Sequence, residues 1–168
     1  GGTPEAWLAA RAHHYSAVVV SRSHNVVRFG PVLDATQPQA LRVVDVEAVT
    51  SIRQSRRADL LKSLGDRRWR ECAEVAQRTL ADEIEGWRRA DIVLCVSDEE
   101  AEFVDRLAPG REIILVAATV DPPERIVARG DRRGMVFLGG FMSGDDAPNA
   151  DTVQYLADDV LPAVWARE

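Results

Sequence analysis

Short apolar runs alternate along this chain with longer stretches of helical period. The runs consist almost wholly of aliphatic and β-branched residues, and they lie at residues 17–20, 41–46, 91–96, 112–116 and 135–138. Runs of four to six residues without a polar face are typical of strands that are covered on both sides. The pattern therefore predicts five strands.

The stretches between the runs carry the spacing of amphipathic helices. Between residues 66 and 90 the apolar positions recur at three- and four-residue steps, which predicts one long helix. Three more helices are predicted from their start signals. The first runs from Thr3-Pro4-Glu5 to about His14, and the second runs from the Ser97 and Glu100 capping box to Pro109. The third begins at Pro148-Asn149, and its buried face holds Val153, Leu156, Val160 and Leu161.

Apolar strands that alternate with helices predict an α/β fold with a parallel sheet between two helical layers, a Rossmann-like doubly wound arrangement. The alternation breaks at residues 120–133, which contain two prolines, one glycine and a series of charged residues. We interpret this segment as a linker. The strand and helix that follow are too small to bury a core of their own. Either they add a strand to the first sheet, or they belong to a larger domain.

The charge balance argues against one class of partner. The 168 residues include 21 Lys+Arg and 27 Asp+Glu, a formal net charge of −6, which disfavours nucleic-acid binding. No apolar run reaches the ~18–20 residues of a membrane span and no signal peptide is evident, so we expect a cytoplasmic protein. Cys72 and Cys95 have no CxxC spacing and no histidine cluster beside them, which favours free thiols and predicts no metal site.

Ligands of open α/β sheets bind where the strands end, which singles out three residues in the first part of the chain. Asp45 and Glu47 follow the second strand two positions apart, so in extended chain they would point the same way and could position a hydroxyl or an amine. The alternative is a helix-capping acid with a salt bridge to Arg53 or Arg56. His24 follows the first strand and is a candidate general base or hydrogen-bond donor, although a lone loop histidine more often has neither role.

A glycine-rich segment after the fifth strand is the second candidate site. Gly139, Gly140 and Phe141 lie between that strand and the helix opened by Asn149. This layout can bring backbone N–H groups and a helix N-terminus to a phosphate. The spacing matches neither the dinucleotide fingerprint nor a Walker A loop, so an ordinary glycine-rich turn remains the alternative.

Arginines gather in clusters at residues 53–57, 67–70, 88–89 and 132–133. Such clusters can bind anionic lipid headgroups or a diphosphate. Because acidic residues are interleaved with them, the simpler interpretation is a set of solvent-exposed helix faces with salt bridges.

Four segments carry a combination of residues that is more specific than any one of them. They are the acidic stretch 45–53, RRADIVLCVSDEE at 88–100, residues 113–121, and GMVFLGGF at 134–141 with PNAD at 148–151 and VLP at 160–162. Together they resemble GT-B glycosyltransferases of the "glycosyl transferases group 1" kind. In that family an acidic segment, an ADxVxxVSxxE segment, an interdomain stretch and the opening of the C-terminal domain follow in the same order.

The resemblance implies a partial GT-B fold. Residues 1–121 would be the C-terminal part of the N-terminal, acceptor-side domain, 122–133 the interdomain linker, and 134–168 the first strand and helix of the donor-side domain. It also implies that the parent is a transferase, which moves a sugar from a nucleotide-diphosphate sugar to a hydroxyl acceptor in polysaccharide or glycolipid biosynthesis. A bacterial source is indicated by the composition instead, since Lys62 is the only lysine and alanine is abundant. Such an enzyme can work at the inner face of the membrane, and we expect this chain alone to be inactive.

The resemblance also suggests roles for the candidate residues. Asp45, Glu47 and His24 would orient the acceptor. The donor diphosphate would lie against Gly139, Gly140, Phe141 and Asn149. The donor is a substrate, and no cofactor is implied.

A different class of function stays open. The chain could be a non-catalytic flavodoxin-like or receiver-like interaction module, in which residues 135–138 complete a five-stranded sheet. Residues 21–23 lack the acidic cluster that a receiver carries there, and a nicotinamide-dependent oxidoreductase would need a fingerprint after the first strand that is absent. An apolar face left uncovered would favour a homodimer.

Overall fold

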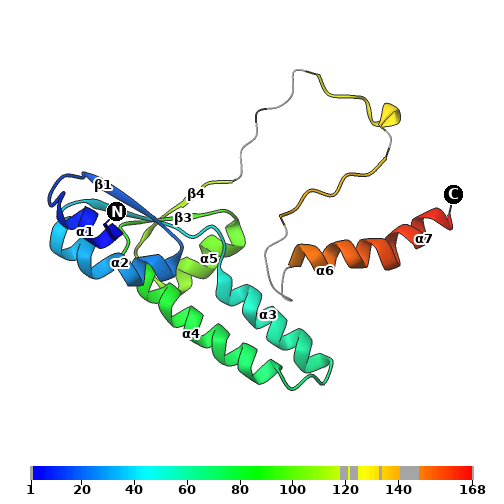
Figure 1. The fold of residues 1–168 in the computed structure, drawn as a ribbon, viewed down its shortest axis with the longest axis horizontal. Coiled ribbons are helices and arrows are strands. Elements are labelled where there is room, and N and C mark those ends of the chain that lie inside the picture. Colours follow the sequence, from blue (N-terminus) through cyan, green and yellow to red (C-terminus); the bar gives the residue numbers. More distant parts are fainter. Residues whose placement is uncertain (1, 118–120, 122–124, 133, 141–147, 168) are drawn as a thin grey trace. The chain divides into compact units, whose positions relative to one another are not determined.

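The computed structural model describes residues 2–117, 121, 125–132, 134–140 and 148–167. The chain divides into two compact units, Gly1–Val120 and Asp121–Glu168. Figure 1 draws both units.

A four-stranded parallel sheet forms the centre of the first unit. Its strands are β1 (Ala17–Ser21), β2 (Leu41–Asp45), β3 (Ile92–Cys95) and β4 (Glu112–Leu115), and they lie side by side in that order. The register aligns Val19 with Val43, Val43 with Ile92, and Ile92 with Glu112. Four of the five predicted strands are thus confirmed, each within a residue or two of its predicted bounds.

Five helices lie among the described residues of this unit: α1 (Pro4–Ala9), α2 (Ser23–Thr36), α3 (Thr50–Ser63), α4 (Trp69–Arg88) and α5 (Asp98–Leu107). The hydroxyl of Thr3 accepts a hydrogen bond from the Ala6 amide, so the predicted cap of α1 is confirmed, but the helix ends at Ala9 instead of His14. The long helix predicted over 66–90 is α4. Helices α2 and α3 were not predicted, because Gly30 and Pro31 interrupt the first and polar residues dominate the second.

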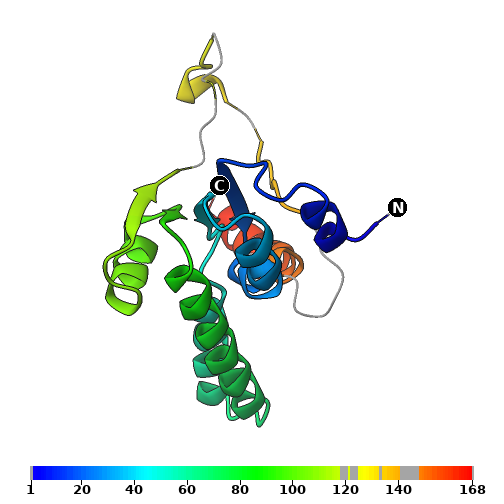
Figure 2. The ribbon, with the colours of Figure 1, turned by 90° about the vertical axis from the view of Figure 1, so that its left-hand side faces the viewer.

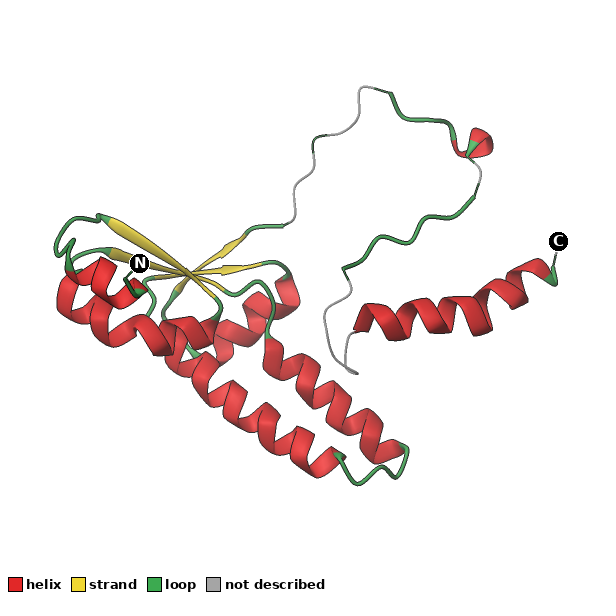
Figure 3. Cartoon of the chain, viewed as in Figure 1, coloured by secondary structure: helices red, strands yellow, loops and turns green. Residues whose placement is uncertain are grey.

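The predicted α/β class and the Rossmann-like parallel sheet are confirmed. Figures 1 and 3 show the helices of the first unit on one side of the sheet. Parallel strands that follow one another in sequence order require this arrangement, because right-handed crossovers all pass over the same face. These four strands correspond to one side of a doubly wound fold. The expected second helical layer is not among the described helices of this unit, and Val19 on the uncovered face is 63% exposed.

The core lies between the sheet and these helices. Trp87, Val93, Cys95 and Val104 are completely buried, and the ring of Trp87 meets Phe103 edge-on with 6.2 Å between ring centroids. Gly86 allows α4 to approach α2 closely, since a Cβ there would lie 3.1–3.3 Å from Ser23 atoms. The apolar spacing in the sequence therefore identified the helix that supplies the centre of this core.

Helices α3 and α4 pack against each other as an antiparallel hairpin. In Figure 2 their far ends extend well beyond the layer formed by the sheet and the other helices. The turn between them contains Gly65 with φ 71°, a left-handed conformation that glycine adopts at little cost. One end of the hairpin thus packs into the core, and the other is surrounded by solvent.

The second unit contains a short 3₁₀ turn, η1 (Arg129–Asp131), and a C-terminal helical stretch. That stretch consists of α6 (Pro148–Tyr155), one π-helical turn η2 (Leu156–Val160) and α7 (Leu161–Trp165). The helix predicted after Pro148 is therefore present. The predicted apolar positions Val153, Leu156, Val160 and Leu161 are half-buried, and none of the side chains described between 121 and 167 is fully buried.

The fifth predicted strand is wrong. Residues 135–138 have no regular secondary structure, and the four-stranded sheet does not include them. Val136 is 89% exposed and Leu138 is 95% exposed. A strand is held by hydrogen bonds to a neighbouring strand, and an apolar sequence without such a neighbour does not form one.

Candidate active site at the carboxyl edge of the sheet

Strands β1 and β2 end side by side at Ser21 and Asp45, and an unusual backbone follows each of them. Arg22 has φ 69° and Glu47 has φ 54°. Left-handed conformations are uncommon for residues other than glycine, asparagine and aspartate, and they persist only where surrounding contacts enforce them. Two of them at neighbouring strand ends mark this edge as a site with a defined, strained geometry.

The Glu47 carboxylate holds the two strand ends together. The Ser21 hydroxyl donates to Glu47 Oε1 at 2.5 Å, and Arg22 Nε donates to Oε2 at 2.8 Å. The hydrogen bond from Ser21 and then the guanidinium of Arg22 lower the pKa of Glu47. This carboxylate is therefore ionised at neutral pH, and it acts as a hydrogen-bond acceptor, not as a proton donor.

Asp45 joins the same network through a turn. Its Oδ1 accepts from the Glu47 amide at 3.2 Å, and its carbonyl accepts from the Arg22 amide at 2.8 Å. The two acids thus share one network, but not in the extended chain that the sequence suggested, because β2 ends at Asp45. A tight turn brings them together, because Glu47 lies beyond the end of the extended chain. The alternative, a salt bridge to Arg53 or Arg56, is not the one formed by Glu47, which pairs with Arg22.

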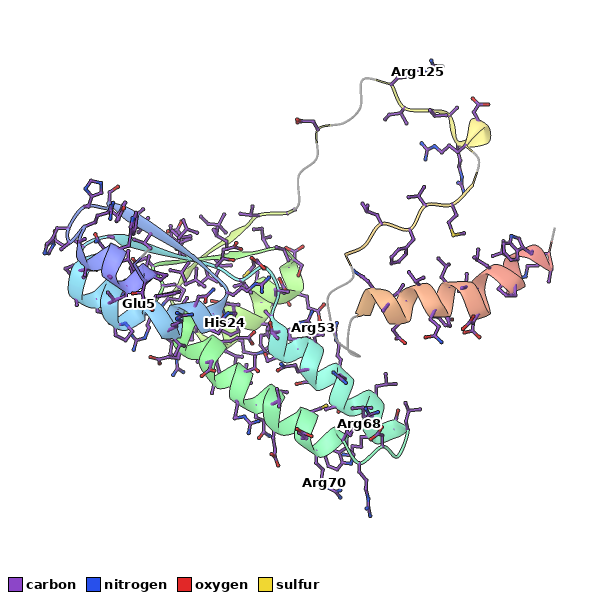
Figure 4. The ribbon with its side chains drawn as sticks, viewed as in Figure 1. Glu5, His24, Arg53, Arg68, Arg70 and Arg125 are labelled. Carbon is purple, nitrogen blue, oxygen red and sulfur yellow. The ribbon has the colours of Figure 1, made fainter. Side chains whose placement is uncertain are left out.

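His24 is close in sequence to Ser21 and Arg22, but its side chain lies outside the network that joins them to the two acids. It is exposed in the first turn of α2 and is labelled in Figure 4. No hydrogen bond or ion pair connects it to Asp45 or Glu47 in the described part of the chain. The structure therefore brings together two of the three predicted residues and leaves the third outside their network.

Two glutamates that the sequence did not place at this site hold the loop after β2. Glu100 Oε1 accepts from the Val49 amide at 2.9 Å, and the buried Glu83 accepts from the Thr50 amide at 2.7 Å and from the Ser51 hydroxyl at 2.5 Å. Glu83 thereby satisfies the first N–H groups of α3, and burial raises its pKa. The only signal for Glu100 was its capping-box position, and Glu83 carried none beyond its place on α4.

The second oxygen of Glu100 is a further acceptor near this edge. Oε2 is buried and has no hydrogen-bond partner within the described residues. The Ser97 hydroxyl accepts from the Glu100 amide at 3.3 Å, as expected of a helix N-cap. The carboxylate of Glu100 thus caps no residue of its own helix, and it supports the Val49 loop instead.

Cys95 lies at the end of β3, but it is not a nucleophile. It is completely buried, and burial raises the pKa of its thiol to about 11. The thiol is therefore protonated at neutral pH. Both cysteines are free, as predicted, with Cys72 half-buried. No group of metal-ligating side chains occurs among the residues that the structure describes.

A pocket of about 290 Å³ adjoins the network at Ser21. Its apolar walls come from α1, β1 and α2, and Asn25 lies in its lining with its amide donating to the Ser21 carbonyl at 2.9 Å. The remaining lining residues are Pro4, Leu8, Val18, Val19, Val20, Phe29 and Leu33. The pocket can take an apolar group and has its polar atoms beside the strand-end network.

The glycine segment of the second unit has a simpler geometry. Asn149 Nδ2 donates to the Gly140 carbonyl at 2.6 Å, which ties this segment to the start of α6. A Cβ at Gly139 would lie 2.9 Å from the Phe137 ring and 3.0 Å from the Asn149 amide, so a larger residue there would require these two side chains to shift. Phe141, the fourth predicted residue, lies outside the described residues.

The comparisons with known proteins identify no relative. No family model matches this chain, and no significant match to it was found among the curated proteins or the solved structures. None of the described helices is both long and apolar enough to cross a membrane.

Proposed function

We propose that this chain is the acceptor-side part of a glycosyltransferase, which moves a sugar from a nucleotide-diphosphate sugar to a hydroxyl acceptor. The observation that supports this proposal most is the strand-end network of Ser21, Arg22, Asp45 and Glu47. It lies where ligands of parallel α/β sheets bind, and it maintains two left-handed residues there. The resemblance of the four sequence segments supplies the reaction class.

The network suggests distinct roles for its two acids. Both oxygens of Glu47 are engaged by Ser21 and Arg22, so we assign Glu47 the role of a positioning residue. Asp45 is half-buried at the end of β2, and its carboxylate would accept a hydrogen bond from the acceptor hydroxyl. His24 is a weaker candidate because its side chain is exposed and outside the network.

The pocket beside Ser21 favours an acceptor with an apolar portion. Its walls are almost entirely aliphatic or aromatic, and its polar groups lie at the Ser21 side. An acceptor whose apolar part fills the pocket would place its hydroxyl group near the network. The donor would bind to another part of the enzyme, to which Gly139, Gly140 and Asn149 would contribute.

A nucleotide titration tests the reaction class. We would titrate UDP, GDP, ADP and their sugars into this chain and into a longer protein that contains it, and measure binding by calorimetry and thermal shift. We expect binding and sugar transfer by the longer protein, and neither by this chain alone. If neither protein responds to any nucleotide, the proposal is wrong and a non-catalytic interaction module becomes the better hypothesis.

A variant pair tests the acceptor side separately. Asp45→Asn in the longer protein should raise KM for the acceptor about tenfold or more, with donor affinity unchanged, because a charged hydrogen-bond acceptor is lost. Glu112→Gln is the matched control, since Glu112 is an exposed acid at the opposite end of the same sheet. Equal acceptor KM values for the two variants would remove Asp45 from the acceptor site.

A further inference from the structure

The free end of the α3–α4 hairpin differs in chemistry from the rest of the chain. We call residues 60–70, which form the end of α3, the connecting turn and the start of α4, the arm tip. Figure 4 labels Arg68 and Arg70 at this end and Arg53 at the other end of α3. Figures 1 and 2 both show the arm tip as the part of the hairpin farthest from the sheet. It can therefore approach a flat surface without hindrance from the sheet and the other helices of the first unit.

The arm tip is basic although the chain is acidic. It holds four basic residues, Lys62, Arg67, Arg68 and Arg70, against the single acid Asp66, which gives a local net charge of +3 in a chain of −6. Asp66 pairs with Arg68 at 2.7 Å. The side chains of Lys62, Arg67 and Arg70 are all exposed.

Apolar side chains lie among these charges. Leu60 is 59% exposed and Leu64 is 71% exposed, and Trp69 is half-buried beside them. Lys62 Nζ and the guanidinium carbon of Arg70 each lie 5.0 Å from the centre of a Trp69 ring. The arm tip thus combines two exposed leucines, one tryptophan and four basic residues within the two helix ends and the turn that joins them.

We propose that the arm tip docks on an anionic membrane surface. Basic side chains close to such a surface are attracted by its negative potential, while leucine and tryptophan side chains enter the headgroup region. A membrane surface accounts for the cations and the exposed leucines together, and an acidic protein partner is the alternative that the leucine variants test. Binding through one small tip is weak and reversible, and it decreases with salt. This inference is independent of the proposed transferase activity.

Vesicle binding by the intact chain tests the proposal. Co-sedimentation would be compared for vesicles of neutral phosphatidylcholine and for vesicles with equal parts of anionic phosphatidylglycerol. We expect binding to the anionic vesicles only, and its loss at about 1 M salt, where the screening length is about 3 Å. Absence of binding to anionic vesicles at low salt would overturn the proposal.

Charge reversal at the arm tip sharpens the test. Each basic side chain near an anionic surface strengthens binding roughly fivefold, so Arg67→Glu with Arg70→Glu should weaken it by about 25-fold or more. The matched control is Arg125→Glu with Arg129→Glu, two exposed arginines of the second unit. Equal losses for the two double variants would show that net charge alone drives binding, which contradicts docking by the arm tip.

The leucines distinguish a membrane from an acidic protein. Leu60→Ser with Leu64→Ser should weaken vesicle binding by about tenfold or more, because less apolar area enters the bilayer interface. Leu138→Ser, at a 95% exposed leucine of the second unit, serves as the control. The double leucine variant could bind vesicles as well as the unchanged chain does, and soluble polyglutamate could displace both proteins from the vesicles equally well. In that case the arm tip is a docking site for acidic proteins and not for a membrane. Circular dichroism verifies that each variant is folded.

Discussion

Residues 92–95 and 135–138 are two similar apolar runs with opposite outcomes. Ile92-Val93-Leu94-Cys95 becomes the third strand of the sheet, with β2 on one side and β4 on the other, and Val93 and Cys95 are completely buried. Met135-Val136-Phe137-Leu138 forms no strand, and the side chains of Val136 and Leu138 are almost fully exposed. An apolar run therefore becomes a strand only where neighbouring strands and a helical layer are available.

The largest expected effect on stability compares one tryptophan of the first unit with one of the second. Trp87→Ala should destabilise the first unit by about 3–5 kcal/mol, because Trp87 is completely buried against Phe103 and leaves a large cavity. Trp165→Ala, at a 65% exposed side chain in α7, should change the free energy of unfolding by about 0.5 kcal/mol or less. Urea unfolding followed by far-ultraviolet circular dichroism measures both. Similar losses in the two variants would mean that the second unit buries α7 against a core.

A second pair compares the apolar runs directly. Val93→Thr keeps the shape of the side chain but places a hydroxyl in the core, and we expect it to cost about 1–3 kcal/mol. Val136→Thr should cost nothing measurable, since its hydroxyl would be in water. The same unfolding experiment measures both variants. A cost at Val136 comparable with that at Val93 would contradict the exposed position of residues 135–138.

A smaller effect concerns the helix starts of the two units. Ser97→Ala removes the hydroxyl that accepts from the Glu100 amide, and a lost N-cap costs about 1 kcal/mol. Asn149→Ala removes the hydrogen bond to the Gly140 carbonyl, and we expect a loss of helical signal from α6 without a change in the unfolding midpoint of the first unit. If Asn149→Ala shifts that midpoint as much as Ser97→Ala does, the two units unfold together.

The smallest expected effect is a change in how steeply the free energy of unfolding varies with pH. Burial raises the pKa of Glu83 in the folded protein, so the folded state binds this proton more tightly than the unfolded chain does. Stability should therefore decrease as the pH rises from the ordinary glutamate pKa through the raised value. Glu83→Gln should remove this decrease, and Asp158→Asn, at an exposed acid of the second unit, is the matched control. Unfolding midpoints over that pH range would measure it, and an unchanged slope in Glu83→Gln would contradict the assignment.

The carboxyl edge illustrates what could be predicted about the site. Asp45 and Glu47 were identifiable because acids after a strand stand where parallel sheets bind ligands. Their partners were not, since Ser21 is 26 residues from Glu47 and Arg22 is 25 residues from it. The left-handed backbone at Arg22 and Glu47 also had no signal in residue types that rarely adopt it. His24 was selected by position alone, and position alone did not bring it into the network.

The local features of this protein follow from neighbouring residues in its sequence. Apolar runs, caps and helical spacing depend on residues within a few positions of one another, and they identified β1 to β4, α4, α5 and the α/β class. Long-range packing, in contrast, selects which runs find neighbouring strands, which face of the sheet the helices cover, and which acids share a network. These outcomes depend on contacts between residues far apart in the chain, whose free energy exceeds that of local preference. For that reason residues 92–95 form a strand and residues 135–138 do not.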